Sequence, residues 1–214
     1  MAEKIVVSDG GVVVWALCNA ICAAKDYLSE VDGAIGDGDH GVNMAKGFAL
    51  AKGRIVEGDS LPDALATLGD TLLDDIGGSM GPIYGTLFLT LSDGLTVGAS
   101  ADDLGLGEAL SKAAADIEGL AGAKPGDKTL VDTIIPAAEA YASAHSAGTD
   151  LAGSLDAMAA ASEKGWRSTE GMVARKGRAS RLGERSVAHL DAGATSCNII
   201  LQTLAHEFKA RIKK

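Results

Sequence analysis

The chain has 214 residues, a formal net charge of -10, and 47% hydrophobic but only 4% aromatic residues. Its length suits one domain with a sizeable core, so we expect residues 1–214 to form a single domain. The acidic balance argues against nucleic-acid binding, because a polyphosphate backbone attracts a basic surface. The three cysteines form no CxxC pair, which indicates reduced thiols and a cytoplasmic location.

An apolar run near the N-terminus, VVVWALCNAICAA at residues 12–24, has the hydropathy of a signal peptide. Glu3 and Asp9 precede it with only Lys4 to oppose them, so it lacks the positive segment that begins a signal peptide. The run is also shorter than the roughly 20 residues that a membrane span needs. We therefore expect a buried helix and no membrane association.

Apolar residues recur with the i, i+3, i+4 spacing of amphipathic helices almost throughout, without a convincing strand-like alternation. Clusters of glycine and proline divide this pattern into eight segments. The expected helices cover residues 7–29, 41–55, 61–76, 82–98, 102–121, 129–146, 150–173 and 193–212. Short connections favour antiparallel neighbours, so the sequence predicts an all-α, single-domain bundle of eight antiparallel amphipathic helices.

The connections between these helices are of two kinds. Those after the second, fourth and sixth helices are short and chemically plain. Those after the first, third, fifth and seventh combine glycine with charge: DGAIGDGDHG, GGSMGP, AGAKPGDK and ARKGRASRLGERSVAHLDAG. In an antiparallel bundle these four lie at the same end. We expect the functional site there; four unrelated surface loops are the alternative.

The first of these loops places Asp32, Asp37 and Asp39 within eight positions. Its GxGxxG pattern does not indicate a dinucleotide site, because no strand precedes it and its aspartates would repel a pyrophosphate. It also lacks the glycine and the glutamate of a helix-loop-helix calcium site. Clustered carboxylates do suit Mg²⁺, which binds them together with phosphate oxygens and water. We therefore interpret the loop as a site for a pair of magnesium ions; a solvated acidic turn is the alternative.

Three further segments suit a phosphorylated ligand. His40 and Asn43 begin the second helix, where free backbone amides and the helix dipole attract anions. The GGSMGP loop indicates a backbone cradle for phosphate, although two glycines before a proline are as often a helix stop. The AGAKPGDK loop is best explained as a turn, with small residues that a flat ring can approach.

The fourth loop is a basic segment in an acidic protein. Such a run is usually a solvated face. Here glycines interrupt it, and His189, Asp191 and Gly193 follow it, which favours a folded loop that binds anions. Arginine supplies fork-shaped donors for phosphate and for the charge that develops in phosphoryl transfer. The cationic residues are Arg175, Lys176, Arg178, Arg181 and Arg185.

Together these motifs resemble the nucleotide-binding (L) subunits of the dihydroxyacetone kinases. The resemblance runs from about Asp32 to the C-terminal helix. It is carried by D-x-x-x-x-G-D-G-D-H-G-x-N, G-G-x-x-G-P, P-G-D-K-T, and A-R-K-G-R-A-S-x-L-G-E-R-S with the following D-x-G-A-T-S. The family fold is a closed barrel of eight amphipathic helices, whose loops at one end bind ADP or ATP through paired Mg²⁺ ions. The resemblance therefore implies that fold and that ligand.

The resemblance also implies a role for each motif. Asp32, Asp37 and Asp39 would ligate Mg²⁺, and Arg178 would be catalytic. Met80 stands where relatives often have a small residue, which leaves only its backbone amide for phosphate. The nucleotide-binding residues implied are His40, Gly41, Asn43, Gly78, Ser79, Met80, Ala121, Leu130, Arg178, Asp191 and Gly193.

The family holds its ketone substrate on a separate K domain, which we do not expect within this chain. The chain would then be a kinase subunit, inactive alone, that passes a phosphoryl group to dihydroxyacetone on a K subunit. A standalone L chain favours the branch in which bound ADP is a coenzyme, rephosphorylated by a phosphoprotein (M) of the phosphoenolpyruvate-dependent sugar transport system. The alternatives are an ATP-consuming kinase subunit for dihydroxyacetone or another short ketose, and a nucleotide-sensing regulatory module. We also allow for a homodimer.

Overall fold

The structure is a computed structural model that describes residues 4–6, 10–95 and 100–213. Its α-helices are α1 (Gly10–Ala23), α2 (Lys25–Ile35), α3 (His40–Arg54), α4 (Leu61–Asp75), α5 (Met80–Leu95), α6 (Asp103–Ala121), α7 (Val131–Ser146), α8 (Leu151–Ser168) and α9 (Ala192–Lys209). Two 3₁₀ segments, η2 (Thr169–Gly171) and η3 (Arg178–Ser186), lie between α8 and α9. The strands are β1 (Lys4–Val6), β2 (Ser100–Asp102) and β3 (Ile212–Lys213).

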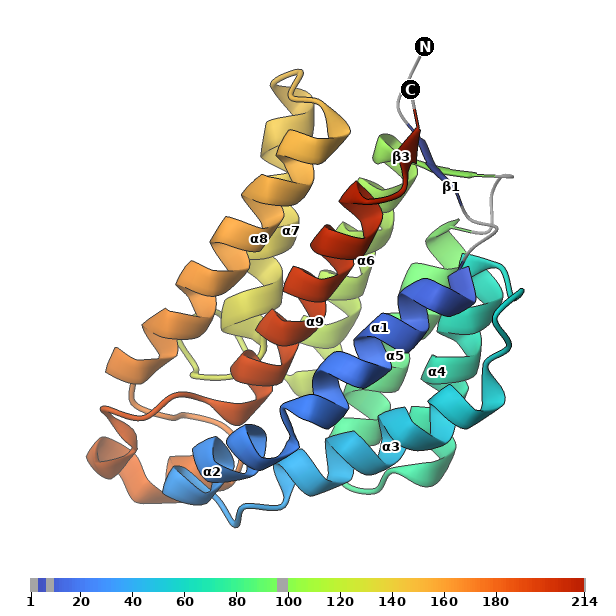
Figure 1. Cartoon of the computed structure of the whole chain (residues 1–214). Coiled ribbons are helices and arrows are strands. Elements are labelled where there is room, and N and C mark those ends of the chain that lie inside the picture. Colours follow the sequence, from blue (N-terminus) through green and yellow to red (C-terminus); the bar gives the residue numbers. More distant parts are fainter. Residues whose placement is uncertain (1–3, 7–9, 96–99, 214) are drawn as a thin grey trace.

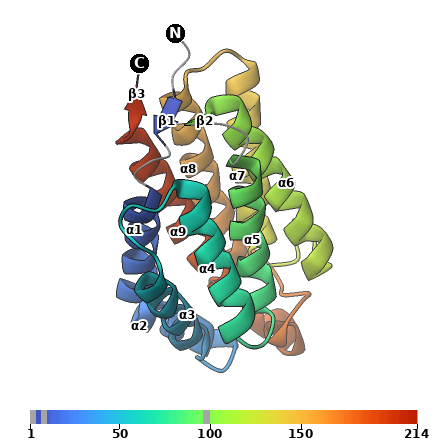
Figure 2. The ribbon, with the colours of Figure 1, turned by 90° about the vertical axis from the view of Figure 1, so that its right-hand side faces the viewer.

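The long helices form a closed ring, as Figures 1 and 2 show. From α3 to α9 each helix packs against the next one in the chain. Helix α1 closes the ring, because it packs against α9 and also against α3 and α4. The shorter α2 lies at the lower end of the barrel in Figure 1, beside α3 and α9. The expected all-α barrel is confirmed.

The first predicted helix, residues 7–29, is wrong as one continuous helix. The chain breaks at Ala24 into α1 and α2, which are bent by 53° relative to each other. The apolar pattern changes at this break: half of the α1 residues are buried, whereas α2 buries only Leu28 and Ile35. Because α2 continues to Ile35, Asp32 lies in a helix and not in a loop. The predicted positions 7–9 and 96–98 lie outside the described residues.

Other helix ends differ from the prediction by a few residues. Helix α5 begins at Met80, two residues early, and the helix expected over residues 150–173 ends at Ser168, where η2 follows. Polar side chains fix two of the starts. The Ser60 hydroxyl accepts a hydrogen bond from the Asp63 amide (3.3 Å), and the Asp150 carboxylate accepts one from the Gly153 amide (2.8 Å). Both are N-caps that satisfy a free amide of the first helical turn.

A small antiparallel sheet, in the order β2-β1-β3, was not predicted. Its register pairs Lys4 with Asp102 on one side and with Lys213 on the other. Strands of two or three residues are too short to show a period-two pattern, so the sequence carries no local signal for them. The sheet lies at the upper end of the barrel in Figure 1, away from the loops that follow α2 and α8.

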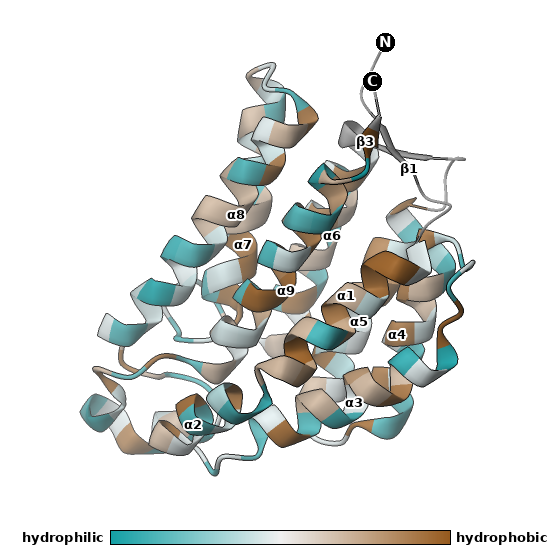
Figure 3. Cartoon of the chain, viewed as in Figure 1, coloured by the Kyte–Doolittle hydropathy of each residue, from teal (hydrophilic) through white to brown (hydrophobic). Residues whose placement is uncertain are grey.

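Small and branched apolar side chains fill the barrel interior. Phe48 and Phe88 are fully buried and meet edge to face, with ring centroids 5.8 Å apart. Figure 3 shows apolar residues gathered along α1 and a mixed pattern along α8. Among the described residues, no helix by itself has the length and hydropathy of a membrane span; only α1 and α2 taken together, as a bent pair, meet those criteria. All three cysteines are free.

Candidate functional site

The four glycine-rich charged connections meet at one end of the barrel, around a cavity of about 640 Å³. Each contributes to the lining: the α2–α3, α4–α5, α6–α7 and α8–α9 connections supply Asp39, Ser79, Lys128 and Arg178 among others. Ten of the eleven residues that were predicted to bind nucleotide line this cavity; Gly41 does not. The antiparallel topology therefore brings the four loops together, as the alternation of plain and charged connections predicts.

Gly41 has a different place in the structure. It lies in the first turn of α3, pressed against the first turns of α2. A Cβ at this position would lie 2.0 Å from the carbonyl oxygen of Lys25 and 2.5 Å from the hydroxyl of Ser29. The glycine thus permits two helices to approach closely at the rim.

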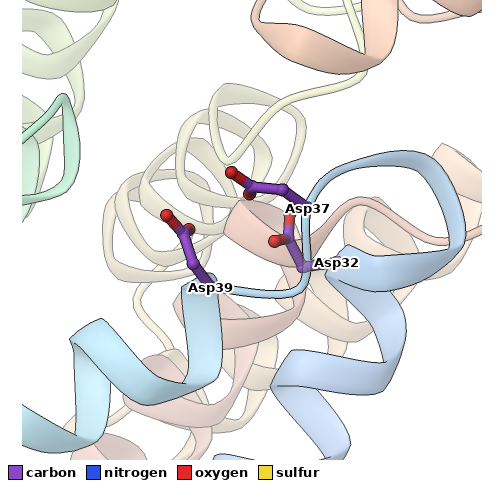
Figure 4. Close-up of side chains that lie close together, drawn as sticks. All are labelled: Asp32, Asp37 and Asp39. Carbon is purple, nitrogen blue, oxygen red and sulfur yellow. The ribbon is translucent and has the colours of Figure 1, made fainter.

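Three carboxylates form a cluster at the rim (Figure 4). Asp32 extends from the last turn of α2, Asp37 from the connection, and Asp39 from the position before α3. One oxygen of each side chain lies within 4.8 Å of one oxygen of each of the other two. Gly38, with φ +76°, provides the turn that brings Asp37 and Asp39 together. Asp32 also accepts a long hydrogen bond, 3.4 Å, from the His40 amide.

The counter-charge to this cluster is Arg178, at the start of η3. Its guanidinium forms an ion pair with Asp37 and a second, at 3.5 Å, with Asp39. The carboxylates of Asp37 and Asp39 raise the pKa of Arg178, so this group stays protonated. Gly177 before it has φ +64°, a left-handed conformation that suits glycine. The basic fourth loop therefore folds back onto the acidic first loop.

The cluster fits a hard divalent cation by the chemistry of its donors. All three groups are carboxylates, and their oxygens are close enough to share an ion or a pair of ions. Only part of their charge is neutralised within the described residues, since Arg178 pairs with two of the three. A cation that prefers oxygen ligands would neutralise the remaining negative charge of the carboxylates.

A buried hydrogen-bond chain connects three helices in the cavity wall. The Nε2 atom of His40 on α3 lies 2.8 Å from the Ser196 hydroxyl on α9, which lies 2.6 Å from the Tyr84 hydroxyl on α5. Tyr84 donates to the carbonyl of Gly193 at 3.0 Å. Burial lowers the pKa of His40 and raises that of Tyr84, which favours the neutral form of both side chains. Tyr84 was not among the predicted site residues, and no local motif distinguishes it from a core tyrosine.

Asp191 caps α9 beside the cavity. Its carboxylate accepts a hydrogen bond of 2.7 Å from the Ala194 amide. Burial raises the pKa of Asp191 to about 6, although the Ala194 hydrogen bond and the charge of Lys128 oppose the shift. The turn at Asp191 and Gly193 is therefore held by a carboxyl group whose pKa lies above its usual range.

Replacing Asp191 by asparagine should change the pH dependence of stability. The folded state keeps a proton that the unfolded state releases between about pH 4 and pH 6. The stability contributed by this proton is present in full below pH 4 and is lost as the pH rises through about 6. The Asp191→Asn variant would lack this dependence, so its unfolding free energy minus that of the wild type should increase across the window. Urea denaturation at several pH values measures it; a constant difference would contradict the assignment.

The chain is thus an all-α barrel with a cavity at one end. Carboxylates lie at this cavity, and the guanidinium of Arg178 lies beside them. The DAK2 domain family matches residues 34–206. The "PEP-dependent dihydroxyacetone kinase, ADP-binding subunit DhaL" of Escherichia coli (strain K12) is 35% identical over 183 residues, 85% of this chain and 87% of that one. The "PEP-dependent dihydroxyacetone kinase 1, ADP-binding subunit DhaL" of Listeria innocua is 38% identical over 182 residues, 84% of this chain and 86% of that one. The chain belongs to the DAK2 domain family, as its motifs indicate.

The fold also matches a solved structure, the dihydroxyacetone kinase from C. freundii in complex with AMP-PNP and Mg²⁺. The TM-score is 0.70, with 22% sequence identity. The match covers 92% of this chain and 33% of that one, so the chain spans a third of the solved kinase. At this identity the match establishes the shared barrel fold.

Proposed function

We propose that this chain is the cytoplasmic nucleotide-binding subunit of a dihydroxyacetone kinase, acting as a single domain. It would hold ADP or ATP with Mg²⁺ at the rim and pass a phosphoryl group to dihydroxyacetone on a separate K subunit. The observation that carries this proposal is the carboxylate cluster beside Arg178, at the mouth of a cavity of about 640 Å³. That volume lies in the range of roughly 300–1,000 Å³ that small-molecule and cofactor sites occupy. The names of the relatives from E. coli and L. innocua support the same reading.

Asp32, Asp37 and Asp39 are the residues that would hold the metal, and we propose a pair of Mg²⁺ ions. When bound, Mg²⁺ neutralises the charge on the phosphate oxygens and favours phosphoryl transfer. Asp32 lies in the last turn of α2 and Asp39 directly before the first turn of α3, so helices fix two of the three carboxylates. That attachment keeps the donors in place before the ligand arrives.

The remaining lining divides into a polar and an apolar part. The first turns of α3 and α5 present backbone amides without partners inside their helix, which suit phosphate oxygens; of these, the His40 amide donates a long hydrogen bond to Asp32. Small and apolar residues from the end of α6 and from the third connection suit the nucleoside, and they include Leu120, 52% exposed, which was not among the predicted site residues. We assign phosphate contacts to His40, Asn43, Gly78, Ser79 and Met80, and nucleoside contacts to Ala121, Leu130, Asp191 and Gly193.

We assign the catalytic role to Arg178. Its guanidinium already lies at the carboxylate cluster, where the phosphates of a metal-bound nucleotide would sit. A planar fork of donors suits the equatorial oxygens of a phosphoryl group in transfer. The residue therefore orients the phosphoryl group and stabilises its developing charge.

The purified chain alone should phosphorylate nothing. Its assigned residues serve the nucleotide, and the ketose and its activating group are expected on the K subunit. Incubation with ATP, Mg²⁺ and dihydroxyacetone should give no dihydroxyacetone phosphate, and addition of a K subunit together with the phosphoryl-donor components should start the reaction. Product formation by this chain and ATP alone would overturn the subunit assignment.

The nucleotide itself should stay bound through purification as ADP. A nucleotide enclosed by four loops, the carboxylate cluster and an arginine should leave slowly, because differences in affinity arise mostly in the off-rate. Slow release suits a coenzyme that is rephosphorylated in place by an M protein, as the phosphoenolpyruvate-dependent names of the relatives suggest. Mass spectrometry of the purified protein and exchange with labelled ATP test this, and light scattering on the same sample tests for a homodimer. Exchange within seconds, with turnover on ATP alone in the presence of a K subunit, would instead support an ATP-consuming kinase.

A further inference from the structure

Lys128 is a buried lysine whose ammonium group lies among backbone carbonyls. Its exposed fraction is 1%. The Nζ atom lies 2.7 Å from the carbonyl oxygen of Thr169, 3.2 Å from that of Met172, 2.7 Å from that of Ser186 and 2.5 Å from that of His189. An ammonium group has three hydrogens, so four acceptors satisfy it completely.

These four carbonyls all belong to the segment between α8 and α9, which carries Arg178 and Asp191. Two come from its beginning and two from its end, so one ammonium group joins the two ends of the loop. The carbonyls lie 41 to 61 residues from Lys128 in the sequence. The contact therefore fixes a long loop from outside it, and the third connection clamps the fourth.

The backbone around Lys128 is held in an unusual conformation to make this contact. Lys128 has φ +63°, a region that residues with a Cβ rarely adopt. The buried carboxylate of Asp132 supports the turn, because it accepts hydrogen bonds from the amides of Gly126 (2.5 Å) and Thr129 (2.8 Å) on either side. The Asp127 carbonyl accepts a further bond from the Arg175 amide (3.1 Å). Such a conformation persists only where surrounding contacts hold it, as these hydrogen bonds do.

The surroundings of the Lys128 ammonium group resemble a binding site for an alkali cation more than they resemble an ion pair. Within the described residues the Nζ atom donates to backbone carbonyl oxygens, which replace the hydration shell of a cation as they do in ion-selective pores. Burial lowers the pKa of Lys128, and the carboxylates of Asp191 and Glu170 oppose that shift. The positive charge of Lys128 is thus balanced by the dipoles of the four carbonyl groups and by the more distant carboxylates of Asp191 and Glu170.

We infer that Lys128 is a positioning residue, a tethered cation whose four carbonyl contacts hold the 169–191 loop in the conformation that presents Arg178 and Asp191 to the cavity. The effect of Lys128 on the loop conformation is independent of the proposed function, whereas its effect on ligand binding rests on that function. Because the contacts require a cationic donor and no particular covalent link, a free ammonium ion of the right size should replace the side chain.

The test removes the Lys128 side chain by substitution and supplies the deleted atoms as a free alkylammonium ion. Lys128→Ala deletes a propylammonium-sized group, so propylammonium chloride is the rescue reagent. Tetramethylammonium chloride at the same concentration has the same charge but no N–H donor. Lys124→Ala is the matched control, since Lys124 is an exposed lysine in the same connection and outside the cavity lining.

Two measurements on the full-length protein follow the loop and the site separately. Without nucleotide, trypsin should cleave the arginine-rich 169–191 loop of Lys128→Ala roughly tenfold faster than that of the wild type, because cleavage follows the population of open loop. With Mg²⁺ and a fluorescent ADP analogue, dissociation should be roughly tenfold faster or more. Propylammonium should reverse both effects, and tetramethylammonium neither.

Wild-type rates of cleavage and release in Lys128→Ala, or equal rescue by both ammonium salts, would overturn the inference. If Lys128→Ala does not fold, Lys128→Met retains the alkyl chain and fills the space, and it should show fast cleavage that propylammonium does not reverse. Wild-type cleavage of Lys128→Met would equally overturn the inference. If the wild type does not bind Mg²⁺ and the ADP analogue, the proposed function fails, while the trypsin measurement still decides whether Lys128 clamps the loop.

Discussion

Replacing Asp39 by asparagine should abolish binding of Mg-ADP while the helical barrel stays folded. The change keeps the size of the side chain and removes one of three carboxylates whose oxygens lie within 4.8 Å of one another. Asparagine is a poorer ligand for a hard divalent cation than a carboxylate. We expect the dissociation constant for Mg-ADP to rise at least about 100-fold, equivalent to roughly 2.7 kcal/mol.

Titration calorimetry measures this loss, and thermal unfolding gives a second readout. A ligand that binds only the folded state stabilises it by about 2.7 kcal/mol at a concentration 100 times its dissociation constant. The wild type should therefore melt at a higher temperature with Mg-ADP, and the Asp39→Asn variant should gain much less. Without ligand the two should melt alike, because the substitution removes both repulsion within the cluster and an exposed ion pair to Arg178.

Glu30→Gln is the control for Asp39→Asn, since Glu30 is an exposed carboxylate on α2, the helix that carries Asp32. This variant should bind as the wild type does. An Asp39→Asn protein that gains as much thermal stability from Mg-ADP as the wild type does would refute the metal assignment.

Replacing Gly41 by alanine should lower both the stability of the fold and the affinity of the site. The new Cβ would lie 2.0 Å from the Lys25 carbonyl oxygen and 2.6 Å from the Ser29 amide nitrogen, so α2 and α3 must move apart. Insertion of even small groups into packed contacts costs about 1–3 kcal/mol, and backbone atoms on the opposing side leave little room to relax. The displacement would also separate Asp32 on α2 from Asp39 at the start of α3.

Gly53→Ala is the matched control on the same helix. No atom lies within 4 Å of a Cβ at Gly53, so this change should stabilise the protein by roughly 0.5–1 kcal/mol through helix propensity. Urea denaturation of both variants, with Mg-ADP titrations of the folded proteins, compares the two sites. If Gly41→Ala is as stable as Gly53→Ala, the close contact of α2 and α3 is not a constraint on the rim.

Much of this architecture was predictable because its signals are local. The helical period, the punctuation by glycine and proline, and the alternation of plain and charged connections together predict both the ring of helices and the end at which its loops meet. The carboxylates of Asp32, Asp37 and Asp39 lie close together in the sequence, so their proximity at the rim required no knowledge of the fold. The motifs likewise identify the family that the comparisons show.

The features that sequence reasoning missed depend on partners far away along the chain. The break at Ala24 comes where α2 turns to pack against α3 and α9, and these contacts are not visible in the local sequence. Lys128 looks like turn chemistry in P-G-D-K-T, because its four partners are carbonyls that any residue carries. Tyr84 and Ser196 are ordinary core positions until the fold brings them to His40.

The way the ring closes has a consequence for the order in which this protein folds. Helix α1 packs against α3, α4 and α9, and the contact from His40 on α3 to Ser196 on α9 bridges 156 residues, so the first helix lacks the last of its neighbours until α9 has been synthesised. Contacts of such long sequence separation must overcome a large loop-closure entropy and slow the folding of a domain. On the ribosome, the apolar α1 must therefore remain without its final partner through most of translation, a stage at which exposed hydrophobic surface recruits chaperones or aggregates. The same C-terminal helix carries the Asp191 turn, so the nascent chain acquires its complete ligand cavity only when the barrel closes.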